Sequence, residues 1–231
     1  MMPRTKIRTS TGVRPFAVVR FLVPAAALLP AAWIGWDAFH DGLGANPIEE
    51  ITHRTGDWAL RLLLLSLAVT PVRRWSGWNK VIRLRRTLGL LAFFYAVLHL
   101  TTFVCLDHFF DWQAIVEDVK KRKYITMGMT AFALLVPLAV TSTRGWIRRL
   151  GKRWTQLHRL VYPAALAATI HFLWLAKGNR SEPKIYASVL LVLLLARIVR
   201  KPRLSPRGSP PTTGTTNPRR PESAAWDASS R

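Results

Sequence analysis

Long apolar runs alternate with short, strongly basic segments along most of this 231-residue chain. A transmembrane helix needs about 20 mostly apolar residues to cross roughly 30 Å of hydrocarbon, and six stretches approach that length. The pattern therefore predicts an all-α, polytopic membrane protein whose six transmembrane helices form a bundle. The predicted spans are 16–39, 57–72, 87–106, 124–141, 157–176 and 185–199.

The second of these spans is short, and the residues before it predict a helical extension. Asn46 precedes Pro47, and Glu49 and Glu50 follow. A capping residue, a proline at the first helical position and acids in the first turn are typical of a helix start. We therefore expect a short outer helix that leads into the second span.

The two ends of the chain differ in composition from its middle. The basic N-terminal segment precedes an apolar run from Phe16 to Phe39, which also occurs in signal peptides, but the run is too long for their hydrophobic region. We interpret it as a retained first span. From Pro202 the chain is rich in Pro, Ser, Thr, Gly and Arg, a composition typical of disorder. The predicted organisation is a basic cytoplasmic arm (1–15), a transmembrane domain (16–200) and a disordered cytoplasmic tail (201–231).

The distribution of charge predicts the orientation in the membrane. The N-terminal arm and the connections 73–86 and 144–153 are rich in Lys and Arg and contain no acid. The alternate connections hold nearly all the acids. Because Lys and Arg are retained on the cytoplasmic side, both termini are expected to be cytoplasmic. One basic run, Lys120–Lys123, falls on the predicted outer side and departs from this pattern.

The net charge of +22 and the pI near 11.6 raise the alternative of a nucleic-acid-binding protein. The charges, however, lie in bursts at the ends of apolar runs. This favours membrane lipid as the surroundings and argues against a nucleic-acid partner. The single cysteine, Cys105, excludes an internal disulfide, a cysteine-ligated zinc site and a cysteine-held iron–sulfur cluster. Covalent c-type haem is excluded as well, because the chain has no Cys-x-x-Cys-His motif.

Two histidines lie deep inside predicted spans, where a ligating side chain is a functional candidate. His99 is about twelve residues into the third span and His171 about fourteen into the fifth, counted from the same side, so their depths agree within a few Å. Two imidazoles at one depth on different helices can hold a b-type haem between them. Each ring's other nitrogen then needs an acceptor, for which Thr101 and Thr102 are candidates. A purely structural, hydrogen-bonded role for each histidine is the alternative.

A third histidine, His158, begins the fifth span near the cytoplasmic surface. It precedes His171 by thirteen residues, which is about 20 Å along a helix. That spacing suits a second, inner haem, provided that Pro163 bends the helix enough to align the two side chains. The facing part of the third span offers Arg85 and Arg86, and no histidine. The sequence therefore predicts one haem and leaves a second one open.

The clustered Lys and Arg residues of the inner connections have two possible explanations. Topology alone explains most of them. Alternatively, some guanidinium groups pair with haem propionates, a flavin phosphate or an acidic electron donor, because arginine offers a planar bidentate fork. The arginines placed for this role are Arg86, Arg153 and Arg159.

Three segments, HDGLGANPIEEITHRTGDWAL (40–60), RRTLGLLAFFYAVLHLTTFV (85–104) and TSTRGWIRRLGKRWTQLHRLVYPAALAATIHFLWL (141–175), resemble the MsrQ family, formerly YedZ. These are haem-binding membrane subunits of bacterial MsrPQ methionine sulfoxide reductase systems, within the ferric-reductase-like transmembrane group. The likeness runs from about residue 20 to 200. The family's histidines correspond to His99, His158 and His171.

The resemblance implies an electron conduit in the bacterial inner membrane. It would accept electrons from the quinol pool or a cytosolic flavin reductase. It would pass them to the periplasmic molybdopterin-containing subunit MsrP, which repairs oxidised methionine in proteins. Besides haem, family members bind FMN, for which the chain shows no recognisable motif.

Two other functions stay open at this stage. The first is a ferric or flavin-linked reductase of the NADPH-oxidase type, although the tail is too short for the flavin and nicotinamide domain of such enzymes. The second is a haem-free membrane assembly or transport subunit.

Overall fold

The computed structural model describes residues 15–176 and 181–198, and every regular element in these ranges is helical. This confirms the all-α prediction for the described residues. The expected arm, apart from Pro15, and the expected disordered tail lie outside the described residues. The α-helices are α1 (Pro15–Phe39), α2 (Pro47–Ser76), α3 (Leu84–Thr101), α4 (Trp112–Lys121), α5 (Lys123–Val140), α6 (Arg144–Leu150), α7 (Lys152–Leu157), α8 (Val161–Leu175) and α9 (Glu182–Ile198). Two 3₁₀ turns, η1 (Asn79–Arg83) and η3 (His158–Leu160), precede α3 and α8, and a π-helical segment, η2 (Thr102–Asp107), follows α3.

Helix α2 begins where its sequence predicts. The Asn46 side chain accepts a hydrogen bond from the Glu49 backbone N–H at 3.4 Å, and Pro47 opens the first turn. At the other end Gly77 adopts a left-handed conformation, with φ of 69°, and its N–H bonds to the Arg73 carbonyl. The predicted helical extension before the second span is confirmed, and it is continuous with that span in a single helix of 30 residues. At about 1.5 Å per residue this helix is longer than the hydrocarbon layer is thick.

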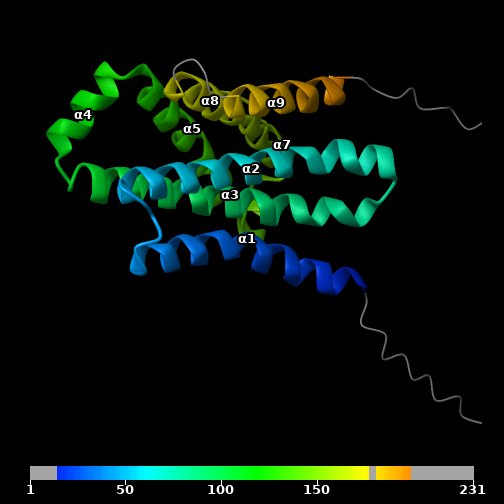
Figure 1. Cartoon of the computed structure of the whole chain (residues 1–231). Helices are drawn as coiled ribbons and strands as arrows, with labels where there is room; N and C mark the ends of the chain where they lie inside the picture. Colours follow the sequence, from blue (N-terminus) through cyan, green and yellow to red (C-terminus); the bar gives the residue numbers. More distant parts are fainter. Residues whose placement is uncertain (1–14, 177–180, 199–231) are drawn as a thin grey trace, which may run out of the picture. The chain divides into compact units, whose positions relative to one another are not determined.

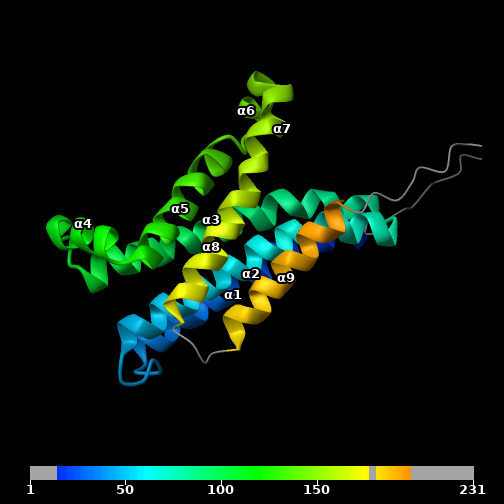
Figure 2. The ribbon, with the colours of Figure 1, turned by 90° about the horizontal axis from the view of Figure 1, so that it is seen from above.

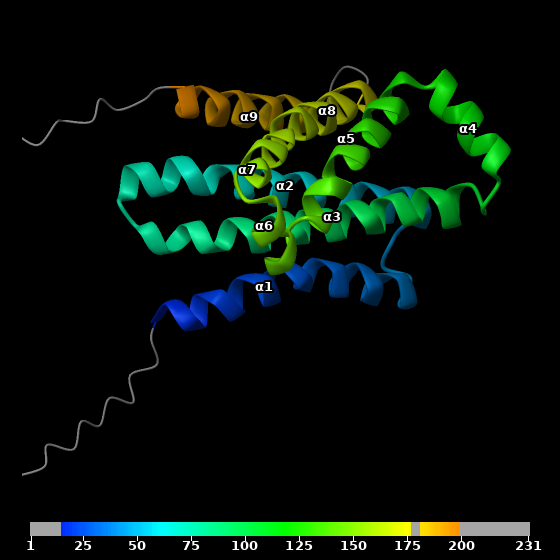
Figure 3. The same cartoon turned by 180° about the vertical axis from the view of Figure 1, so that it is seen from behind.

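Two antiparallel helix pairs organise the described residues. Helix α2 packs mainly against α3, and α5 mainly against α8. Helix α1 lies along α2 and α3 on one side, and α9 lies against α8 and α2 on the other (Figure 1). Seen from above, α5 and α8 run at an angle to α2 and α3 (Figure 2), and the view from behind shows α3 passing close to α5 (Figure 3).

Four helical segments are long and apolar enough to cross a membrane: Phe21–Phe39, Pro47–Ser76, Asn79–Asp107 and Lys123–Val140. This composition supports a membrane protein. Helices α8 and α9 fall at the expected fifth and sixth spans but have only 15 and 17 residues. Six spans, and cytoplasmic positions for both termini, therefore stay predictions.

The buried core lies where α2 meets α3 and α8. Leu67 of α2 and Tyr95 of α3 are fully inaccessible to solvent, and they are packed in one cluster with Ala92, Ala164 and Ala165. Small residues let helix backbones approach closely in membrane proteins. The alanines thus allow the two helix pairs to meet.

Short helices outside the expected spans complete the fold. In the chain, α4 connects α3 to α5, and α6 and α7 connect α5 to α8; Figure 2 shows these short helices at the ends of the helices that they connect. Pro163 was expected to bend the interior of a long helix. Instead it stands in the first turn of α8, directly after the 3₁₀ turn His158–Leu160. A proline is well tolerated there, since the first helical N–H groups lack partners within the helix.

Candidate functional site

The rings of His99 and His171 lie together between the two helix pairs. His99 lies in the last turn of α3, and His171 lies near the end of α8. Their ring centroids are 6.1 Å apart, and the ring planes are inclined by 77°. Both side chains are partly buried. The structure thus brings together the two histidines that their depth in the spans singled out.

Each of these rings is bound to a backbone carbonyl of the neighbouring helix. His99 Nδ1 lies 2.9 Å from the Thr52 carbonyl oxygen in α2, and His171 Nδ1 lies 2.7 Å from the Tyr124 carbonyl oxygen in α5. A carbonyl can only accept, so both Nδ1 atoms carry the proton in these bonds. Each acceptor precedes its histidine by 47 residues. The two halves of the site therefore share one arrangement, in which a helix carbonyl accepts a hydrogen bond from a histidine 47 residues later. This similarity was not recognised in the sequence.

This arrangement corrects the expected acceptors. The Thr102 hydroxyl donates to the Leu98 carbonyl within its own helix, and Thr101 is exposed. Neither threonine binds a histidine ring among the hydrogen bonds of the described residues. The acceptors come from helices packed beside the histidines, not from the residues next to them in sequence.

The separation of the rings suits one metal ion held between them. Bonds from imidazole nitrogen to a metal are about 2.0–2.1 Å, and a ring centroid lies roughly 1.1 Å from its nitrogens, so two such ligands on one ion have centroids about 6 Å apart. The 6.1 Å observed matches this value. Since Nδ1 is engaged on each ring, Nε2 is the nitrogen that can bind the metal. The residues present therefore fit a bis-histidine haem.

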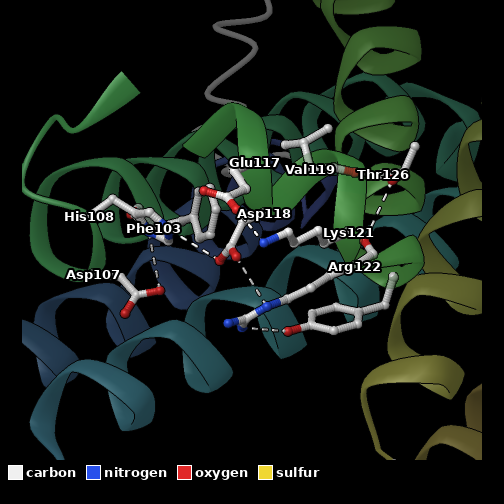
Figure 4. Close-up of polar contacts among 10 residues, drawn as sticks. Phe103, Asp107, His108, Glu117, Asp118, Val119, Lys121, Arg122 and Thr126 are labelled. Atoms are coloured by element: carbon white, nitrogen blue, oxygen red, sulfur yellow. Dashed lines mark hydrogen bonds and ion pairs between the residues drawn. The ribbon is translucent and has the colours of Figure 1, made fainter. Parts of the chain in front are cut away.

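An ion-pair network holds the segment that leads into Tyr124 (Figure 4). Asp118 of α4 contacts His108 Nε2 and Arg122 Nε, each at 3.2 Å. Arg122 also donates to the Tyr124 hydroxyl at 3.2 Å. Thr126 donates to the Val119 carbonyl at 2.6 Å. These contacts fix α4 against the start of α5, where the carbonyl that binds His171 is located.

The same pairs explain the basic run on the predicted outer side. Lys121 pairs with Glu117 and Arg122 with Asp118, each one helical turn away. Lys121 and Arg122 therefore have acidic partners in α4, whereas the three connections that determine the predicted orientation contain no acid.

His158 lies apart from this pair, at the other end of α8. Its ring stacks on Trp154 with a centroid distance of 3.9 Å, and its Nδ1 lies 3.2 Å from the Trp154 carbonyl oxygen. Its Nε2 is 3.5 Å from the Ser142 hydroxyl. No second histidine contacts it among the described residues. The geometry thus offers one bis-histidine site and leaves His158 without a matching ligand in the part of the chain that the structure describes.

The predicted arginines lie at the same end as His158. Arg86 of α3, Arg153 of α7 and Arg159 of η3 all have exposed side chains, and none of them reaches the histidine pair. Sequence reasoning passed over Arg85, which is partly buried and lies within electrostatic range of His158 and of Arg197. Its exposure could not be inferred from the run of basic residues around it.

The remaining histidines make local contacts. His40 stacks on Trp36, His53 lies 3.9 Å from Glu49, and His108 pairs with Asp118. Within the described residues, no group of three or more His, Cys, Asp or Glu side chains could hold a metal ion. A haem iron needs only two protein ligands, because the porphyrin supplies the other four.

A known family matches most of the segment that forms this site. The family described as ferric reductase like transmembrane component matches residues 55–169. The matched range contains His99 and His158 and ends just before His171.

Whole-chain relatives give a narrower match. A protein of Xanthomonas axonopodis pv. citri is 50% identical over 200 residues, covering 84% of this chain and 90% of the relative. One from Rhodospirillum rubrum is 52% identical over 194 residues, covering 84% and 93%. One from Xanthomonas campestris pv. campestris is 52% identical over 191 residues, covering 80% and 87%. All three are named protein-methionine-sulfoxide reductase haem-binding subunit MsrQ. No solved structure matches the chain.

Proposed function

This chain belongs to the MsrQ family of ferric-reductase-like membrane proteins, and from that premise we propose that it carries electrons across the bacterial inner membrane through one b-type haem. The single observation that supports this most is the pair of imidazoles with centroids 6.1 Å apart. In this proposal His99 and His171 would hold the haem. Bound between them, the haem supplies a reversible one-electron couple at its iron.

The protein residues prepare both ligands before the haem binds. The Thr52 and Tyr124 carbonyls accept the Nδ1 protons and so fix the tautomer that presents Nε2 to the metal. Leu98, next to His99 in the chain, and Ala168 and Phe172 of α8, close to His171 in the chain, are packed against the buried apolar core. Such surroundings limit the access of water and lower the local dielectric constant, two factors that tune a haem's reduction potential.

The position of the pair supports delivery of electrons at the outer face. Both histidines lie toward the ends of α3 and α8, beside the first turns of α2 and α5. Glu49 and Glu50 lie at this same end, in the first turn of α2. If Lys and Arg mark the cytoplasmic side, this acidic end is periplasmic. We propose that it faces the molybdopterin-containing subunit MsrP, which reduces methionine sulfoxide in proteins.

The opposite end of the bundle is the proposed entry for electrons. His158 lies there with Arg85 and Arg197, and the exposed Arg86, Arg153 and Arg159 surround the same basic connections. Clustered guanidinium groups suit a phosphate or a carboxylate. The proposed donor is the quinol pool or a cytosolic flavin reductase, with FMN as a second cofactor by family membership.

A reconstituted electron-transfer assay tests this function. The full chain, supplied with haem during expression, is placed in liposomes and reduced with a quinol under anaerobic conditions. Addition of MsrP together with a methionine-sulfoxide-containing protein should reoxidise the reduced haem band, and omission of either should not. Retention of the reduced band with active MsrP and substrate present would contradict the proposal.

The family match favours one second candidate, a ferric or flavin-linked reductase. The same preparation distinguishes it. Direct reduction of the haem band by NADH alone, or quinol-driven reduction of ferric chelates without MsrP, would support that alternative. A colourless protein would instead favour a haem-free assembly subunit.

A further inference from the structure

The carbonyl groups that bind His99 and His171 both belong to α-helices, near the starts of α2 and α5. The carbonyl of residue i in an α-helix already accepts from the N–H of residue i+4. The Cβ atom of residue i+4 leans toward the helix N-terminus and so lies over the preceding turn. A bulky second donor such as an imidazole can therefore lie closer to the carbonyl where that Cβ is absent.

Both helices have glycine at this position. Gly56 stands one turn after Thr52 in α2, and Gly128 stands one turn after Tyr124 in α5. Glycine is poorly suited to a helix interior, since it has more backbone freedom to lose than alanine. Its presence at equivalent positions of both pairs calls for a local reason.

The surroundings of the two glycines supply that reason. A Cβ atom on Gly56 would lie 3.0 Å from His99 Cε1 and 3.1 Å from its Nδ1. A Cβ atom on Gly128 would lie 2.9 Å from His171 Nδ1 and 3.1 Å from its Cε1. At both glycines the three nearest heavy atoms belong to the histidine ring, so the space is used by the imidazole and not by a neighbouring backbone.

We propose that Gly56 and Gly128 are positioning residues for the haem ligands. Each uncovers one helix carbonyl, so that the imidazole of the partner helix can lie against the glycine and donate its Nδ1 proton. This inference rests on the proposed haem function and adds to it a pair of residues that set the orientation and basicity of both ligands. The unit of carbonyl, glycine and histidine occurs twice with the same spacing, once in each helix pair.

The histidine ring lies closer to the Cβ position at Gly128 than at Gly56, so the two substitutions should differ in their effect. Three ring atoms of His171 lie within 3.3 Å of the Cβ position at Gly128, whereas the third atom of His99 is 3.8 Å from that at Gly56. A methyl group at Gly128 should therefore displace its histidine more than a methyl group at Gly56.

Alanine substitutions in the full haem-loaded chain test the proposal. Gly56→Ala and Gly128→Ala should push the ring off its carbonyl, which weakens the Nδ1 hydrogen bond and makes Nε2 a poorer electron donor. Because partners of this kind are worth about 10- to 100-fold in metal-site affinity, haem should dissociate faster by a factor in this range. The midpoint potential should move to more positive values, more for Gly128→Ala than for Gly56→Ala.

Gly89→Ala in α3 is the matched control, because a Cβ atom there meets nothing within 4 Å. It should leave haem retention and midpoint potential unchanged. A merely structural role for the helical glycines predicts the same small effect at all three positions, so equal potentials would overturn the proposal. If Gly128→Ala fails to accumulate, the comparison of Gly56→Ala with Gly89→Ala decides.

Two ligand variants separate this inference from the proposed function. If His99→Ala and His171→Ala both keep full haem, the ligand assignment is wrong and the proposed function fails with it. If both lose haem while Gly56→Ala and Gly128→Ala behave like Gly89→Ala, only the positioning role is wrong.

Discussion

The hydroxyl of Tyr95 bridges two backbone groups of α1, and its removal is a quantitative test of the packing beside the site. Tyr95 donates to the Ala27 carbonyl at 2.7 Å and accepts from the Ala31 N–H at 3.0 Å. These two groups are hydrogen-bonding partners in a regular helix. The hydroxyl is thus inserted into the hydrogen-bond ladder of α1, while the ring is fully buried in α3. Tyr95→Phe removes the oxygen and keeps the ring.

The expected cost follows from the two groups that lose a partner. A buried polar group left unsatisfied costs about 1–3 kcal/mol, and part of this is recovered if α1 closes the direct bond from Ala31 to Ala27. We expect Tyr95→Phe to lower the free energy of unfolding by about 1–3 kcal/mol in total.

Equilibrium unfolding in mixed micelles, followed by tryptophan fluorescence, measures this change. Tyr124→Phe is the control, because its hydroxyl bonds to Arg122 at an exposed position. Its effect should stay within about 0.5 kcal/mol. If Tyr95→Phe and Tyr124→Phe unfold at the same denaturant concentration, the bridging role of the hydroxyl is refuted.

Two further substitutions test the core and the outer network by the same measurement. Leu67→Ala truncates a fully buried side chain and should lower the free energy of unfolding by about 2–5 kcal/mol. Leu191→Ala, at a side chain that is 58% exposed, should lower it far less. Equal losses of stability would contradict the described core. Asp118→Asn removes the charge that pairs with His108 and Arg122. It should lower the free energy of unfolding by about 1 kcal/mol or less, and this decrease should become smaller at high salt. A decrease that is independent of salt would argue against an electrostatic role.

The helices could be predicted from the sequence better than their packing could. The start of α2 at Asn46–Pro47 follows from capping chemistry, which acts within one turn. The faces that pack against other helices were not predicted. Leu67 is fully buried and Leu65 is half exposed on the same helix. Both are apolar, because lipid tails and the protein interior both favour apolar side chains.

The short helices between the spans were missed for a related reason. Helix α4 has only ten residues, and a helix of that length is marginal in isolation. Its stability depends on contacts such as those of Asp118 with His108 and Arg122. These contacts join residues before, within and after the helix, and they form only once the segment has folded back on itself.

The candidate site, too, could be predicted from the sequence only in part. The depth of His99 and His171 could be counted along the chain, because a helix rises by a constant amount per residue. The acceptors for their Nδ1 protons could not be predicted, since every residue offers a carbonyl and packing alone decides which one a ring reaches. The equal spacings of Thr52 and Tyr124, and of Gly56 and Gly128, from their histidines were available as a signal. His158 stays a prediction as a ligand.

Electron paramagnetic resonance of the oxidised, haem-loaded full chain tests the central claim most directly. The ring centroids of His99 and His171 are 6.1 Å apart, and two imidazoles on one ferric haem iron would give a low-spin signal. We expect this signal in the wild-type protein and its loss in both His99→Ala and His171→Ala. A high-spin signal in the wild type, or an unchanged low-spin signal in both variants, would contradict ligation of one iron by these two histidines.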